Sequence, residues 1–226
     1  MESKLDRRTV LKTAGGAGLA AAFGTRALSL LGEDALAADA ASTCLLTPEA
    51  TEGPYWVDYG ISRRNVTEGR PGTPLVIRFT VLNARTCRIV RNADVEIWHC
   101  DALGDYSAVN GASTRFLRGH QRSNAKGIAE FLTIFPGWYR GRTPHIHMKV
   151  SVGGDEVHTG QIFFDETLTR TVYRQAPYAS RGQSDTPHAR DMIYRQAGGS
   201  RAELELKRRT GGLKGYVGTI AIGVVT

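Results

Sequence analysis

Two histidines, His145 and His147, stand two positions apart in a stretch rich in apolar and β-branched residues. In a β-strand, residues two apart project from the same face, so both imidazoles would be directed at the same space. Two neutral imidazoles in this arrangement are a natural clamp for a transition metal. The pair alone does not decide the matter, because histidines with this spacing also occur at surfaces and in structural positions.

The oxygen donors near this pair are phenols. Residues 135–150 contain no cysteine, aspartate or glutamate, which disfavours a zinc set and a site of two histidines and one carboxylate. Tyr139 lies in this segment, and Tyr106 follows a second strand-like run. A phenol with a pKa of about 10 binds as phenolate only to a strongly Lewis-acidic ion, which favours ferric iron. A tyrosine by itself is more commonly a half-buried ring with a hydrogen-bonded hydroxyl group.

The elements that would position these residues are short strands. Six runs combine β-branched and aromatic residues with partial two-residue alternation, and they span residues 75–82, 93–100, 128–135, 145–152, 156–164 and 215–225. Turn clusters separate them, so we expect an all-β fold, a β-sandwich of mostly antiparallel strands with long active-site loops. Weak helical turns are expected at 167–174 and 191–196. Residues 177–209 are interpreted as a long excursion between the penultimate and last strands.

Composition bounds the class of protein. The chain has 226 residues, of which 41% are hydrophobic and 23% charged, which is typical of a soluble protein with a core and excludes a disordered chain. The 29 Lys and Arg exceed the 22 Asp and Glu, but the basic residues are scattered, so we expect no nucleic-acid partner. No internal repeat and no second domain is evident.

The first residues have the layout of an export signal. The pair Arg7-Arg8 precedes an apolar stretch of small residues, 13–23, and Ala35-Leu36-Ala37 is typical of a cleavage site. We therefore expect export to the periplasm or beyond the cell by the twin-arginine machinery, without stable membrane association afterwards. The alternative is an ordinary N-terminal helix with a basic start. The expected organisation is a signal at 1–37, an extended segment packing on the core at 38–74, and the β-sandwich at 75–226.

An oxidising destination would permit a disulfide. The chain has three cysteines, Cys44, Cys87 and Cys100, enough for one bridge and one thiol. We favour Cys44–Cys87, because Cys100 ends a strand-like run and would be buried.

Beyond these motifs, nearly all of the chain from Leu45 to Val225 resembles the intradiol ring-cleavage dioxygenases that act on catechol, protocatechuate or hydroxyquinol, in particular a small secreted, twin-arginine-exported branch. The resemblance rests on several motifs in the family's order, at residues 46–55, 95–106, 116–121, 136–150 and 159–164. It implies an oxidoreductase of aromatic compound catabolism that inserts both atoms of O₂ into a catecholic ring. Cleavage between the two hydroxylated carbons would give a cis,cis-muconate-type diacid.

The resemblance also implies a non-haem Fe(3+) cofactor. Its ligands would be Tyr106, Tyr139, His145 and His147, with Tyr139 and His147 axial. Tyr139 would also accept a phenolic proton from the substrate.

Further roles follow from the same resemblance. Arg142 would stabilise negative charge on the substrate ring, and Gln161 would orient ligands or substrate. Gly53, Pro54 and Tyr55 would line the substrate pocket together with Arg142. Four other histidines match no ligand position: His99, His120, His158 and His188.

Two departures from the family pattern bear on function. Only five residues separate Tyr139 from His145, fewer than in classical members, which favours an open pocket and looser selectivity among catechols. The N-terminal dimerisation region of catechol-type enzymes is missing, so that mode of homo-oligomer is not assumed. Two alternatives remain: a secreted binding module for aromatics or glycans that has lost oxidation, and a hydrolase using another metal.

Overall fold

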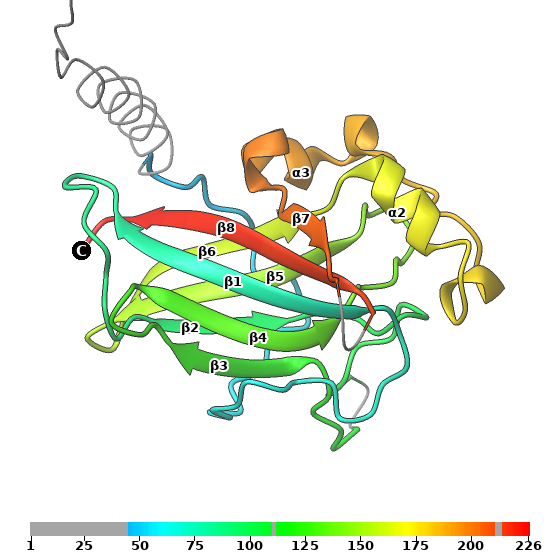
Figure 1. Cartoon of the computed structure of the whole chain (residues 1–226), viewed down its shortest axis with the longest axis horizontal. Coiled ribbons are helices and arrows are strands. Elements are labelled where there is room, and N and C mark those ends of the chain that lie inside the picture. The colour runs from blue at the N-terminus through cyan, green and yellow to red at the C-terminus, as the bar shows by residue number, and fades with distance from the viewer. Residues whose placement is uncertain (1–44, 110–111, 211–213) are drawn as a thin grey trace, which may run out of the picture. The chain divides into compact units, whose positions relative to one another are not determined.

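The computed structural model describes residues 45–109, 112–210 and 214–226 (Figure 1). The predicted export signal at 1–37 and Cys44 lie outside the described residues, so predictions about them stay predictions. Among the described residues, no helix is long and apolar enough to cross a membrane.

Two four-stranded sheets form the fold, as expected for an all-β sandwich. The first has the order β4-β1-β8-β7 and the second β3-β2-β5-β6. All neighbouring strands are antiparallel except β1 and β8, which are parallel. The strands are β1 (Pro74–Asn83), β2 (Asp94–Trp98), β3 (Arg118–Arg122), β4 (Ile128–Ile134), β5 (His145–Val152), β6 (Asp155–Phe163), β7 (Glu205–Arg208) and β8 (Tyr216–Val224).

The hydrophobic core lies between the two sheets and fixes which way the histidines point. Alternate residues of β5, namely Ile146, Met148 and Val150, are buried in this core with side chains from both sheets. Because successive residues of a strand face opposite sides, His145 and His147 project from the outer face of the second sheet. Both are nevertheless buried, since loops cover that end of the sheet.

Helical turns gather beyond the ends of β6 and β7 (Figure 1). Both expected turns are confirmed, as α2 (Glu166–Val172) and α3 (Met192–Gln196). The excursion at 177–209 was wrongly interpreted as lying between the last two strands, because β7 forms within it. The 3₁₀ helices are η1 (Tyr178–Ser180), η2 (His188–Arg190) and η3 (Gly199–Ala202).

Residues 45–73 contain no named strand and run along both sheets. Single bridges join Leu46 to β8, Ser62 to β3 and Asn65 to β4. Residues 51–56, here called the strap, contact the outer face of the second sheet through the hydrogen bond, ion pair and ring contacts described below.

The cysteines differ in state. Cys100 is buried and free, and it lies just after β2 rather than in it. Cys87 is disulfide-bonded. Its predicted partner, Cys44, lies outside the described residues, so the pairing stays a prediction.

Candidate metal centre

One row of side chains across the second sheet organises the site. Strand pairing places Trp98 of β2 opposite Arg118 of β3 on one side and His147 of β5 on the other, and places His147 opposite Gln161 of β6. Directly paired residues have Cβ atoms only about 5 Å apart on the same face of a sheet. His145 projects from this face two residues before His147. Four strands therefore deliver five side chains to one end of the sheet.

The two histidines direct their Nε2 atoms at each other, 3.2 Å apart. The Nδ1 atom of His145 lies 2.7 Å from the carbonyl oxygen of Thr143. Because a carbonyl only accepts hydrogen bonds, Nδ1 carries the proton and Nε2 keeps its lone pair. Burial, reinforced by the Arg142 charge, lowers the pKa of His145 to about 3. Burial also lowers the pKa of His147 well below its usual value. Both rings are therefore neutral and suited to bind a metal.

Both predicted tyrosines reach this site. The Tyr139 hydroxyl lies 3.0 Å from His145 Nε2, and burial raises its pKa to about 12. The ring of Tyr106 lies 5.8 Å from that of Tyr139 and 6.2 Å from that of His147, between centroids. Its hydroxyl is buried without a hydrogen-bond partner among the described residues, and burial raises its pKa well above the usual value. Without a positive ion, both phenols stay protonated.

His147 is held between a ring and the strap. The Trp98 indole stacks on the imidazole with centroids 4.9 Å apart and planes 9° apart. On the strap, a Cβ built on Gly53 would lie 3.1 Å from His147 Cε1. Gly53 has φ +74°, a conformation that favours glycine. Glycine is required here by both the backbone and the space.

The other two strap residues predicted to line the pocket, Pro54 and Tyr55, differ in whether they reach the site. The Tyr55 ring stacks on Tyr106 at 4.6 Å and meets the Tyr139 ring edge-on at 6.4 Å, between centroids. Pro54 is exposed. Of the three predicted pocket residues, the structure thus brings Gly53 and Tyr55 to the site.

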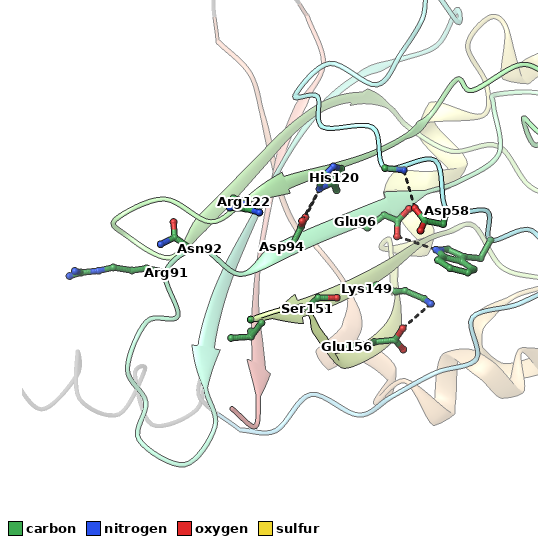
Figure 2. A pocket seen from close by; sticks show the side chains of 15 residues that line it. Asp58, Arg91, Asn92, Asp94, Glu96, His120, Arg122, Lys149, Ser151 and Glu156 are labelled. Carbon is green, nitrogen blue, oxygen red and sulfur yellow. Dashed lines mark hydrogen bonds and ion pairs between the residues drawn. The ribbon is translucent and has the colours of Figure 1, made fainter.

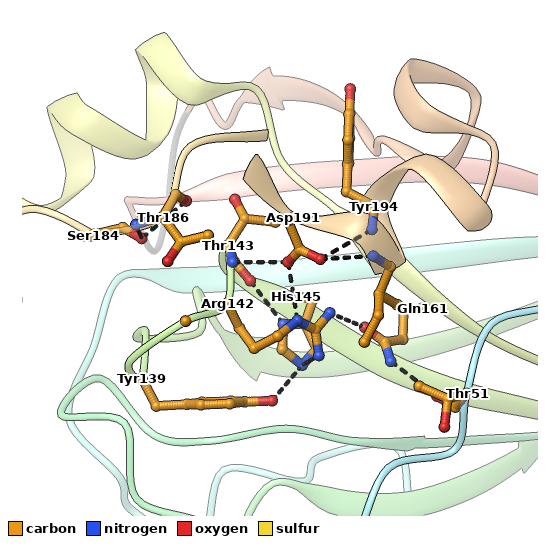
Figure 3. A network of polar contacts seen from close by, with 12 residues as sticks. Thr51, Tyr139, Arg142, Thr143, His145, Gln161, Ser184, Thr186, Asp191 and Tyr194 are labelled. Carbon is orange, nitrogen blue, oxygen red and sulfur yellow. Dashed lines mark hydrogen bonds and ion pairs between the residues drawn. The ribbon is translucent and has the colours of Figure 1, made fainter. Parts of the chain in front are cut away.

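Arg142 is fixed by two partners (Figure 3). Its Nε donates to Asp191 at 2.9 Å, and its Nη2 donates to the Gln161 side-chain oxygen at 2.5 Å. Gln161 in turn donates to the carbonyl of Thr51 on the strap at 2.8 Å. The Nη1 atom lies 3.5 Å from His145 Nε2. A guanidinium group is therefore held rigidly beside the two imidazoles.

Asp191 is a residue that the sequence analysis missed. Its carboxylate also accepts hydrogen bonds from the backbone N–H groups of Thr143, Ile193 and Tyr194. Burial opposes ionisation, but the Thr143 N–H group and the Arg142 charge outweigh it, so the pKa of Asp191 lies below its usual value. The position before a helical turn predicts an N-cap, but nothing in the sequence predicts the contact with Arg142.

The donor set fits a hard trivalent cation. Two imidazole nitrogens and two phenol oxygens converge, and one of those oxygens has no hydrogen-bond partner in the part of the chain that the structure describes. In the described ranges, no cluster of three His, Cys, Asp or Glu is arranged to hold a metal. The phenols would join the two imidazoles as ligands in the form of phenolates.

A cleft of about 720 Å³ lies further along the same face (Figure 2). Its floor is the next cross-strand row, in which Glu96 pairs with His120 and Lys149. Lys149 forms ion pairs with Glu52 of the strap and with Glu156, which separates this polar cleft from the histidine pair. None of the predicted site residues lines it.

Two of the other histidines are held by partners outside the site, whereas His158 Nε2 is buried without a hydrogen-bond partner among the described residues. His99 is fully buried and bonded to Thr133 and to the Cys100 carbonyl. His120 bonds to Asp94.

Comparison with known proteins identifies the family of the chain. The family model described as Dioxygenase matches residues 51–172. A catechol 1,2-dioxygenase 2 of Acinetobacter lwoffii is 30% identical over 142 residues, which are 53% of this chain and 51% of the relative, so the match spans about half the length of that protein.

Two solved structures share the fold. An intradiol ring-cleavage dioxygenase from Tetranychus urticae has a TM-score of 0.77 and 31% identity, covering 80% of this chain and 95% of that one. The dioxygenase domain of a dioxygenase carbohydrate-binding protein fusion from Streptomyces sp. SirexAA-E has a TM-score of 0.61 and 27% identity, with 80% and 99% covered. The chain belongs to the intradiol ring-cleavage dioxygenase family.

Proposed function

We propose that this chain is an Fe(III)-dependent intradiol dioxygenase that uses O₂ to cleave a catecholic ring between its hydroxylated carbons, giving a cis,cis-muconate-type diacid. The observation that carries the proposal is the convergence at His145 Nε2, which has His147 Nε2 at 3.2 Å and the Tyr139 hydroxyl at 3.0 Å. Tyr106 completes the donor set with a buried hydroxyl that has no hydrogen-bond partner within the described ranges.

Tyr106, Tyr139, His145 and His147 would hold the iron. When bound, ferric iron supplies a Lewis acid that draws electron density from the catecholate ring. The Tyr139 oxygen, bound as a phenolate, would accept a phenolic proton from the substrate.

Arg142 would stabilise negative charge that develops on the ring. Its guanidinium is held by Asp191 and Gln161 before the reaction begins, so little reorganisation is needed. Tyr55, together with Gly53 and the neighbouring Pro54, would border the substrate. The short connection from Tyr139 to His145 supports acceptance of substituted catechols.

Iron analysis, visible spectroscopy and an oxygen electrode test the proposal. The iron-loaded protein should show a tyrosinate-to-iron charge-transfer band that changes when catechol is added under nitrogen. O₂ uptake is then compared for catechol, protocatechuate, hydroxyquinol and caffeate, and the product is identified by mass. A loaded protein without the band refutes the site, and substrate binding without O₂ uptake favours the binding module.

We further propose export by the twin-arginine route. The pair Arg7-Arg8 and the following apolar stretch support it, and the disulfide at Cys87 is typical of an oxidising compartment. Replacing both arginines by lysine should retain the protein in the cytoplasmic fraction. Unchanged export of that variant would refute the route.

A further inference from the structure

Arg118, the first residue of β3, is a buried charge that forms no ion pair with a carboxylate of the described residues. The residue is 2% exposed. Its Nε donates to the hydroxyl of Ser107 and its Nη2 to the carbonyl of Ser107, both at 2.8 Å. Its Nη1 has no partner, and no ion pair of the described residues includes it. The sequence motif at 116–121 contains this arginine, and the proposed function gives it no role.

An uncompensated buried charge is costly, so a buried guanidinium requires a nearby negative charge. The candidate is Tyr106, which directly precedes Ser107. Arg118 donates to both the hydroxyl and the carbonyl of Ser107, so its guanidinium lies against the residue that follows Tyr106. The Tyr106 hydroxyl, like Arg118 Nη1, is buried without a hydrogen-bond partner among the residues that the structure describes. Ser107 connects the two residues, because Tyr106 precedes it in the chain and Arg118 donates to it.

Arg118 is also tied to the rest of the row. It pairs with Trp98, whose indole stacks on His147. Its contacts with Ser107 therefore join the turn that carries Tyr106 to the strands that carry the imidazoles. Removing them would weaken the hold on this turn, which the Ser107 hydroxyl also fixes by donating to the Phe116 carbonyl.

We propose that Arg118 is a positioning residue of the metal centre: it fixes the turn after Tyr106 through Ser107 and supplies the positive charge that offsets the Tyr106 phenolate. The inference rests on the proposed function, because it requires Tyr106 to bind as an anion. It adds to the four proposed ligands a charged residue, Arg118, that does not itself bind the metal.

The test compares Arg118→Gln and Arg118→Lys with Arg122→Gln, an exposed control on the same strand. Iron affinity is measured by competition with a chelator, and the charge-transfer band is recorded for each loaded protein. We expect Arg118→Gln to weaken iron binding at least tenfold, in the range of about 10–100-fold typical of groups that support ligands. The band should move to longer wavelength, because the phenolate loses a stabilising charge. Arg118→Lys, which keeps the charge but not the fork, should weaken binding less.

Each outcome decides. Wild-type affinity and band position in Arg118→Gln overturn the inference while leaving the proposed function intact, whereas a wild-type protein without the band overturns the proposed function itself. Equal losses in Arg118→Gln and the Arg122→Gln control also overturn the inference. If Arg118→Gln does not fold, Arg118→Lys and Ser107→Ala decide, because both should retain the fold and bind iron more weakly than wild type. Wild-type affinity in both would then refute it.

Discussion

Asp191→Asn isolates the carboxylate that holds Arg142. Its Oδ2 accepts from Arg142 Nε at 2.9 Å and from the Thr143 N–H group at 3.0 Å. Its Oδ1 accepts from the N–H groups of Ile193 and Tyr194 at the start of α3. The asparagine side chain has only one acceptor oxygen, so its NH₂ group must face either the two donors at Oδ2 or the two donors at Oδ1. Since asparagine is as good an N-cap as aspartate, the oxygen should turn to α3 and release Arg142.

The magnitude follows from burial. The Asp191 side chain is 1% exposed and that of Arg142 15%, so solvent screens the pair little. Breaking a buried pair by removing one charge costs about 3–5 kcal/mol. For a domain of this size each kcal/mol lowers the unfolding midpoint by roughly 2–4 °C, so we expect a drop of roughly 10 °C. Turnover should fall as well, by about 100-fold, because Arg142 is no longer held beside the site.

Urea unfolding and O₂ uptake measure the two effects. Asp165→Asn is the matched control, because Asp165 caps α2 by accepting only from the Leu168 N–H group and is exposed. The control should change stability by only a few tenths of a kcal/mol. Stability and turnover of Asp191→Asn equal to those of the control would refute the reasoning.

Three further predictions concern other parts of the site and core. Burial lowers the pKa of His99 from 6.5 to about 4, so about 3 kcal/mol of stability that is present above pH 6.5 is lost as the pH falls towards 4. In urea unfolding, the stability of His99→Gln should fall less steeply with pH than that of the wild type, and equal slopes for the two proteins would contradict this. Gly53→Ala should lower iron retention after desalting, because the added Cβ would meet His147. Gly60→Ala is the control, because Gly60 also has a positive φ, +55°, but a Cβ there would have no atom within 4 Å; equal losses of iron would mean that backbone strain alone matters. Arg142→Ala should keep the visible band and lower turnover by about 100-fold or more; loss of the band would instead make the residue necessary for metal retention.

Alternation of apolar residues predicted the main strands well. The strand at 145–152 has the predicted bounds, because its core-facing Ile146, Met148 and Val150 are all apolar. Strands β3 and β7 were missed, since their sequences, Arg-Gly-His-Gln-Arg and Glu-Leu-Lys-Arg, are polar. Backbone pairing with neighbouring strands forms both, and this tertiary effect overrides local propensity.

The site was predictable where its residues share a motif. The spacing of His145 and His147 indicated a common direction, and the structure brings Tyr106 and Tyr139 to them. Asp191 was not predictable, because it lies 49 positions from Arg142, with which it pairs. Contacts of this separation arise from the path of the loops, which local pattern does not specify.

The parallel pairing of β1 with β8 constrains how the chain assembles. Strand β1 pairs with β8 only after residues 216–224 have been made, and nine positions of β1, from Leu75 to Asn83, take part in this pairing. Closing so long a loop costs entropy before the ladder forms, which slows folding. During synthesis the sheet stays divided until residues 216–224 have left the ribosome, so closure of the sandwich is a late step of folding.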